Sequence, residues 1–222
     1  MEELTGSATD VVKSPAGRAA NAWYLVAKRI ADRFVVVLLS LLCLPLMLIV
    51  AALIKLDSRG PVLFKQTRIG KGREPFKMYK FRTMCNEAED MLPSMLHLNE
   101  EPTGMLTKIK DDPRITRLGR ILRTTSIDEL PQLLNVIKGD MSLVGPRPPM
   151  PSEVVLYNDH HMRRLEITPG ITGLWQVSGR KNLSFEEMVE LDLAYTAKRG
   201  PLLDLWILLK TFPEVLKMNG AR

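Results

Sequence analysis

The chain has 222 residues, enough for one globular domain with a sizeable core and extra sequence at one end. Its 31 lysines and arginines exceed its 25 acidic residues, and the charge of +6 suits anionic partners such as phosphates, acidic lipids or nucleic acid without choosing among them. Cys43 and Cys85 have neither disulfide nor metal-ligand spacing, which excludes a disulfide framework and indicates a reducing compartment.

Residues 1–21 are small and polar without an apolar period, and they predict a loose tail. Residues 34–54 contain no charged side chain. At the rise of an α-helix these 21 positions span about 31 Å, close to the thickness of the hydrocarbon core of a bilayer. We therefore predict a membrane segment within residues 22–59 and a cytosolic domain over residues 60–222.

Basic residues flank this segment on both sides and would hold both of its ends in the cytosol. Pro45 lies near the middle, where it interrupts the helical hydrogen bonds and leaves two arms of about 15 Å each. These features favour a re-entrant helix that enters and leaves by one membrane face, with Ser40 and Pro45 at its hinge. An ordinary transmembrane helix with a tolerated proline stays an alternative, because the larger basic cluster after the segment could set the orientation alone.

Residues 62–64 and 75–81 alternate apolar and polar side chains around a glycine turn, which predicts a β-hairpin. Lys80 and Arg82 give its second strand the character of a solvated basic edge.

Two helices are predicted after the hairpin, and the first covers residues 86–101. The second opens within residues 111–120, and Arg114, Arg117 and Arg120 line one of its sides. Such a stripe is usually solvated, but beside a membrane it could lie against lipid phosphates.

Apolar residues at helical spacing predict the buried face of a short helix: Leu130, Leu133, Leu134 and Ile137. The helix is expected to end at about Lys138, because Gly139 suits a left-handed C-terminal position. Pro131 lacks a backbone N–H and is tolerated only in roughly the first turn. Asp128 and Glu129 are therefore placed at the helix N-terminus.

A helix N-terminus favours an ionised carboxylate and a bound phosphate, so this acidic pair offers a candidate nucleophile. The structural alternatives are that Asp128 is an N-cap and Glu129 a dipole partner, or that Ser126 and Glu129 form a capping box.

Glycines within residues 168–180 surround a short apolar strand and would let the backbone approach a ligand, while Arg180 adds a charge suited to phosphate. Ser184 begins a helix that carries Asp192 on its apolar face, where an acid either reaches solvent or is committed to a partner. Residues 202–212 predict a last helix that is apolar nearly all round, suited to a membrane interface or to the core.

Residues 126–135 and 138–148 together resemble the signature of the bacterial sugar transferases, the monotopic phosphoglycosyl transferases. Four further blocks resemble the same family: residues 79–84, 111–120, 168–180 and 191–195. The resemblance implies an α+β, mostly helical fold in which a re-entrant N-terminal helix precedes a small cytosolic domain with a short β-hairpin and interfacial helices. Larger members carry several membrane helices before this domain, whereas one apolar segment occurs here, so we expect a catalytic core.

The family resemblance also implies a reaction. Asp128 would attack the phosphate nearest the sugar of a nucleotide sugar and expel a nucleoside monophosphate, and a polyprenyl phosphate would then take the phosphosugar. Glu129 would bind Mg²⁺. Substrate and phosphate binding is expected from a set of mostly basic residues: Lys80, Arg82, Arg114, Arg147, Gln176, Arg180 and Asp192.

The implied partners are a UDP-sugar, undecaprenyl phosphate and the cytoplasmic face of a bacterial inner membrane, with no role for nucleic acid. Two other functions fit parts of the sequence: a metal-dependent phosphodiester hydrolase, and a non-catalytic module that binds polyanions at a membrane surface. The sugar is open, although the block around Gln176 looks more like that of hexose-using exopolysaccharide members. The oligomeric state is open too, with a homodimer among the alternatives.

Overall fold

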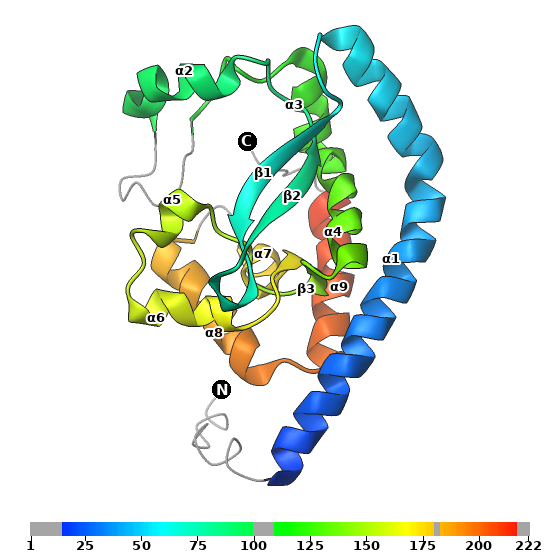
Figure 1. Ribbon diagram of the computed structural model, residues 1–222, viewed down its shortest axis with the longest axis vertical. Coiled ribbons are helices and arrows are strands. Elements are labelled where there is room, and N and C mark those ends of the chain that lie inside the picture. The colour runs from blue at the N-terminus through cyan, green and yellow to red at the C-terminus, as the bar shows by residue number, and fades with distance from the viewer. Residues whose placement is uncertain (1–14, 100–108, 180–182, 217–222) are drawn as a thin grey trace.

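A computed structural model describes residues 15–99, 109–179 and 183–216. The described chain is mostly helical with two small sheets, which confirms the predicted α+β class. Helix α1 runs along one side of the globular part, next to α3, α4 and α9, and the β1–β2 hairpin lies at the centre of the view (Figure 1).

Helix α1 is one continuous element, Pro15–Asp57, and it passes through Pro45. It begins inside the predicted tail of residues 1–21, of which residues 1–14 lie outside the described chain. Its section Trp23–Asp57 is long and apolar enough to cross a membrane, and 18 consecutive residues within it reach a mean hydropathy of 3.0. The ribbon of α1 changes direction in its second half (Figure 1). That α1 is a re-entrant membrane helix with a hinge at Ser40 and Pro45 stays a prediction.

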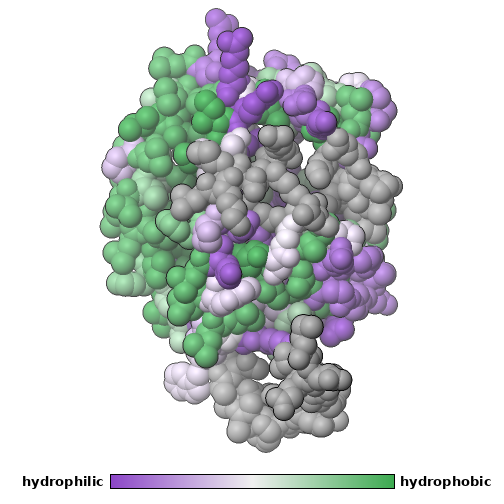
Figure 2. All heavy atoms as spheres, turned by 180° about the vertical axis from the view of Figure 1, so that it is seen from behind, coloured by the Kyte–Doolittle hydropathy of each residue, from purple (hydrophilic) through white to green (hydrophobic). Residues whose placement is uncertain are grey.

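Both halves of α1 pack on the globular part. Val36 is buried in the main core with Met141, which lies between α4 and β3, and with residues of β2, α4, β3, α8 and α9: Met78, Leu133, Val136, Leu143, Val144, Tyr195 and Ile207. Val50 and Ile54 are buried in a second core with Phe81 and Leu122. The opposite side of the helix is exposed, and apolar residues cover this flank of the molecule (Figure 2).

A polar clamp of Lys28, Asp32 and Asp204 fastens the N-terminal half of α1. Lys28 Nζ lies 2.7 Å from the Asp204 carboxylate and 3.4 Å from that of Asp32. Asp32 accepts hydrogen bonds from the hydroxyl of Ser142 and, at 3.2 Å, from the backbone N–H of Leu143. These charged side chains are nearly buried, so each would be costly to bury without its hydrogen-bond and ion-pair partners.

The predicted hairpin is confirmed. Strand β1, Leu63–Ile69, pairs antiparallel with β2, Pro75–Phe81, through a turn that holds the short 3₁₀ helix η1, Lys71–Arg73. The pairing sets Lys80 opposite Phe64.

The helices that follow the hairpin are short. They are α2 Ala88–Met95, η2 Leu96–Leu98, α3 Arg117–Thr124, η3 Ile127–Gln132 and α4 Leu133–Lys138. Gly139 ends α4 with φ of 92°, as predicted. The predicted buried face is confirmed for Leu133 and for the half-buried Leu130, but it is wrong for Leu134 and Ile137, which are exposed. A 3₁₀ turn has about three residues instead of 3.6, so η3 shifts the phase of the helix, and Val136 faces the core.

The rest of the domain surrounds a two-stranded parallel sheet. Strand β3, Ser142–Val144, pairs with β4, Gly170–Thr172. The remaining elements are α5 Pro151–Val154, α6 Asp159–Met162, η4 Arg163–Glu166, α7 Leu174–Val177, α8 Phe185–Lys198 and α9 Pro201–Leu216. Ser184 caps α8 with the predicted capping box. One side of α9 is buried at Ile207, and its other side exposes Leu205, Leu209 and Phe212.

Candidate active site

The acidic pair lies in η3, directly after α3. Ser126 adopts the left-handed conformation, with φ of 59°, and this one residue ends α3 and starts η3. Its side chain makes no capping hydrogen bond, so the alternative of a Ser126–Glu129 capping box is excluded. The N-cap position belongs to Ser126, and Asp128 lies inside the 3₁₀ turn, where it is buried.

Lys80 connects the hairpin to this pair. Its Nζ lies 2.7 Å from Glu129 Oε1, and both side chains are partly exposed. The ion pair is thus with Glu129, whereas Asp128 feels the lysine charge without a direct contact of this kind. The chain therefore brings together one buried carboxylate, one accessible carboxylate and one ammonium.

Asn135 in α4 fixes the edge of the hairpin beside the acidic pair. Its Oδ1 accepts from the backbone N–H of Tyr79 at 3.0 Å, and its Nδ2 donates to the carbonyl of Lys77 at 2.7 Å. It is fully buried, and both bonds hold strand β2 just before Lys80. Sequence reasoning missed this residue, although a polar amide among apolar positions of a helix was a usable signal.

Burial raises the pKa of Asp128 to about 6; the positive charges of Lys80 and Arg123 oppose this rise, and Glu129 adds to it. We had expected a helix N-terminus to favour the ionised form, but removal from water outweighs that effect here. Asp128 is still mostly ionised at neutral pH. Arg123, at the end of α3, is a second site residue that the sequence did not single out from its neighbouring arginines.

The raised pKa predicts an acid limb in the pH profile. An attacking Asp128 must be deprotonated, so kcat/KM for the nucleotide sugar should fall tenfold per pH unit below about 6, well above the ordinary pKa of an aspartate. Lys80→Gln removes a charge that lowers this pKa and should move the limb to higher pH. Lys77→Gln, which changes an exposed lysine of the same strand, should not. A limb near pH 4, or one unmoved by Lys80→Gln, would contradict the assignment.

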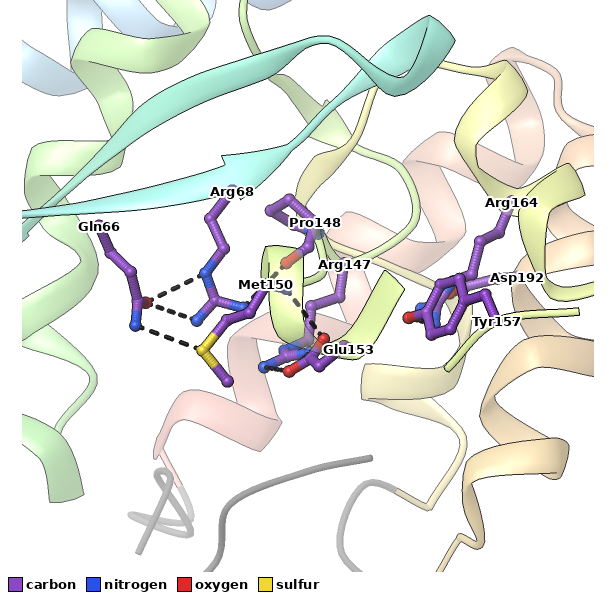
Figure 3. Close-up of polar contacts among 9 residues, drawn as sticks. All are labelled: Gln66, Arg68, Arg147, Pro148, Met150, Glu153, Tyr157, Arg164 and Asp192. Carbon is purple, nitrogen blue, oxygen red and sulfur yellow. Dashed lines mark hydrogen bonds and ion pairs between the residues drawn. The ribbon is translucent and has the colours of Figure 1, made fainter. Parts of the chain in front are cut away.

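Arg147 lies in the loop after β3, between Pro146 and Pro148. Its Nη1 lies 3.2 Å from Glu153 Oε2, and its side chain is 29% exposed, whereas that of Glu153 is 3% exposed (Figure 3). Arg147 is therefore anchored at one edge and accessible, as phosphate binding requires.

The glycines after this loop serve packing. A side chain at Gly170 or Gly173 would collide with the backbone of Gly145, at 2.1 and 2.5 Å. The close approach that these glycines allow is thus to the loop that carries Arg147, and the predicted approach to a ligand is not what the described chain shows.

Arg82 and Arg114 have internal partners. Arg82 donates to the carbonyls of Ser58 and Arg59, both at 2.7 Å, and so holds the end of α1. Arg114 donates to Asp112 and is buried before α3 begins, off the predicted stripe. Their guanidinium groups are committed to the fold, so this geometry does not support their predicted role in phosphate binding.

The other predicted residues differ in position. Asp192 is fully buried and accepts from Arg164 Nη2, so it is committed to a partner and reaches no solvent (Figure 3). Gln176 in α7 donates to the carbonyl of Ile171 at 3.3 Å. Arg180 lies outside the described residues.

The donor set fits a magnesium ion of the kind that bridges protein and substrate. Within the described ranges no three metal-ligating side chains converge, so a site built wholly from protein is not present there. Mg²⁺ is commonly held by one or two carboxylates, waters and substrate phosphates. Glu129 offers an accessible carboxylate next to Asp128, which suits that mode.

Comparison with known proteins identifies the family of the chain. A family model described as bacterial sugar transferase matches residues 23–218. The galactosyl transferase CpsE of Streptococcus agalactiae is 44% identical over 200 residues, which are 90% of this chain and 44% of CpsE. The exopolysaccharide production protein ExoY of Rhizobium meliloti is 40% identical over 199 residues, 88% of each chain.

A third relative is named for its reaction. The UDP-glucose:undecaprenyl-phosphate glucose-1-phosphate transferase of Caulobacter vibrioides is 42% identical over 204 residues, 87% of this chain and 71% of that protein. Together the fold, the site and these matches define a transferase. The chain belongs to the bacterial sugar transferase family, as its motifs predicted. It spans less than half of CpsE and most of ExoY.

Proposed function

We propose that this protein transfers a sugar-1-phosphate from a UDP-sugar to undecaprenyl phosphate and releases UMP, as a membrane step of exopolysaccharide or capsule assembly. The observation that carries the proposal is the buried Asp128 beside the Lys80–Glu129 ion pair. The name of the Caulobacter relative describes the same class of reaction.

The chemistry follows from an ionised carboxylate next to positive charge. An Asp128 carboxylate oxygen attacks the phosphorus that carries the sugar, and the bond from that phosphorus to the oxygen of the leaving UMP breaks. An oxygen of undecaprenyl phosphate then attacks the same phosphorus and releases Asp128 as a carboxylate. Lys80 and Arg147 supply positive charge for the diphosphate, and the nearby Arg123 offsets the charge of Asp128 itself.

Glu129 is the residue that would hold Mg²⁺, with Asp128 as its neighbour. A bound magnesium ion supplies neutralisation of the diphosphate charge, which lets one anion approach another. The Lys80 ammonium holds the Glu129 carboxylate turned toward the hairpin.

Attachment to one membrane face is supported by α1. Lys28 and Asp32 of the polar clamp lie before the uncharged residues 34–54 and Ile54 lies at the end of them, yet both ends contact one globular body. A helix that crossed the bilayer would separate them. Cysteines introduced at Trp23 and Arg59 in a Cys43→Ser, Cys85→Ser background should react with an impermeant maleimide from the same side of the membrane, and reaction from opposite sides would show a crossing helix.

The function is tested by measuring UMP release and labelled lipid together. With UDP-sugars, Mg²⁺ and undecaprenyl phosphate, the purified protein should form a lipid-linked sugar phosphate in step with UMP. A hydrolase would release UMP and free sugar phosphate at the same rate without lipid. Loss of lipid binding in small steps with each Lys or Arg change, with no turnover at all, would favour a non-catalytic polyanion-binding module.

A further inference from the structure

Arg68 of β1 lies beside the loop that carries Arg147, and it is 6% exposed (Figure 3). Its Nε and Nη2 both donate to Gln66 Oε1, at 3.0 and 2.6 Å. Its Nη1 donates to the carbonyl oxygen of Pro148 at 3.0 Å. Gln66 thus orients the guanidinium so that Nη1 can donate to the carbonyl of Pro148, the residue after Arg147.

The backbone of β1 holds the same loop. The N–H of Ile69 donates to the carbonyl of Pro149 at 2.9 Å. On the other side, Glu153 of α5 accepts from the backbone N–H of Met150 at 3.0 Å and pairs with Arg147. The loop is therefore held between β1 and α5, and Arg147 is its accessible charged side chain.

The charges around the loop do not balance within this group. Arg68 and Arg147 bring two positive charges, and Glu153 brings one negative charge. Burial, together with the like charge of Arg147, lowers the pKa of Arg68 to about 9, and the negative charges of Glu153 and Glu129 oppose this fall. An anion that binds at Arg147 would offset the surplus, and Arg68 itself has hydrogen bonds from all three guanidinium nitrogens.

We propose that Arg68, oriented by Gln66, is a positioning residue that fixes the Pro148 carbonyl so that Arg147 presents its guanidinium to the diphosphate of the nucleotide sugar. The inference rests on the proposed function, and Arg68 does not touch the substrate. Its role is to hold the loop in the binding geometry before the donor arrives, which lowers the entropy lost on binding.

The test measures UDP binding by calorimetry in the Asp128→Asn background, with Mg²⁺ present. UDP carries the diphosphate without committing to a sugar, and this background separates binding from turnover. Arg68→Lys keeps the positive charge but cannot bridge Gln66 and Pro148, so we expect UDP to bind about tenfold more weakly. Gln66→Leu, which removes the orienting acceptor, should weaken binding in the same way.

A variant one residue away on the same strand provides the control. Thr67→Ala removes an exposed bond from Lys77 to Thr67 and should leave UDP binding unchanged. In the active enzyme, Arg68→Lys should raise KM for the nucleotide sugar with KM for undecaprenyl phosphate unchanged.

A purely structural role for Arg68 predicts another pattern. The thermal midpoint and the amount of folded enzyme would fall, while the Kd of UDP for the folded protein and the donor KM stayed constant. That result, or an equal loss of UDP affinity in Thr67→Ala, would overturn the inference. A wild-type protein that binds UDP but transfers no phosphosugar would instead count against the proposed function.

Discussion

Asp128→Asn is expected to stop UMP release from UDP-sugar, with a loss on the order of 10³-fold or more. The amide has nearly the shape of the carboxylate but no anionic oxygen to attack phosphorus. The Asp128 side chain is buried in η3, where a change of volume would disturb the packing. Asparagine has nearly the same volume, so the substitution should leave the fold in place. The measurement is single-turnover UMP release without lipid acceptor, together with UDP binding to show that the site is intact.

Glu129→Gln is the matched comparison for this prediction. It removes a charge from the neighbouring position and breaks the ion pair with Lys80, but it leaves the attacking carboxylate. UMP release should slow and need more Mg²⁺, yet the covalent product should still form. Equal release by the wild type and Asp128→Asn would assign the attack to another group.

Asp192→Ala is expected to destabilise the protein by about 3–5 kcal/mol, because it leaves Arg164 charged and buried without its carboxylate. Burial raises the pKa of Asp192 to about 6, and the positive charge of Arg164 opposes this rise. The contact with Asp192 joins η4 to α8, and Arg164 also donates to the hydroxyl of Tyr157, between α5 and α6, at 3.0 Å. Thermal or chemical unfolding of the detergent-solubilised protein measures the change.

Two further variants isolate the buried pair. Glu190 lies on the same helix as Asp192 and makes an exposed contact with His160. Glu190→Ala breaks this contact and should cost less than about 1 kcal/mol of stability. Replacing both partners, as Arg164→Met with Asp192→Leu, should recover much of the lost stability. If Asp192→Ala left stability unchanged and weakened only donor binding, Asp192 would act on substrate, as the sequence alone suggested.

Local patterns predicted several elements well. The capping box at Ser184, the glycine after α4 and the glycine turn of the β-hairpin each act within a few residues, so the sequence carries their signal directly. The acidic pair was likewise placed at the start of a helical segment from the position of Pro131.

Long-range contacts could not be predicted in this way. Arg82 and Arg114 look like a phosphate-binding set, but their partners are carbonyls and a carboxylate that only the folded chain brings near. The exposure of Leu134 follows from a 3₁₀ turn that the periodicity did not reveal. The raised pKa of Asp128 depends on burial, which the residue pattern does not encode.

The polar clamp of α1 was missed for a related reason. Lys28 and Asp32 precede the uncharged membrane segment, where charged residues are expected at a membrane surface. Asp204 lies in a helix that is otherwise almost entirely apolar. Each has an ordinary local explanation, and only their meeting at 2.7 to 3.4 Å shows that they fasten α1 to α9 and β3. Strand β3 runs directly into the Arg147 loop, so the clamp joins the apolar helix to the proposed site.

The central claim is a phosphosugar bound to Asp128, and mass spectrometry tests it most directly. The wild-type protein is incubated with UDP-sugar and Mg²⁺ without lipid acceptor, quenched, and digested. The account predicts a mass increase of one sugar phosphate on the peptide that contains Asp128, which is lost when undecaprenyl phosphate is added. UMP release with no adduct, or an adduct on another residue, would contradict it.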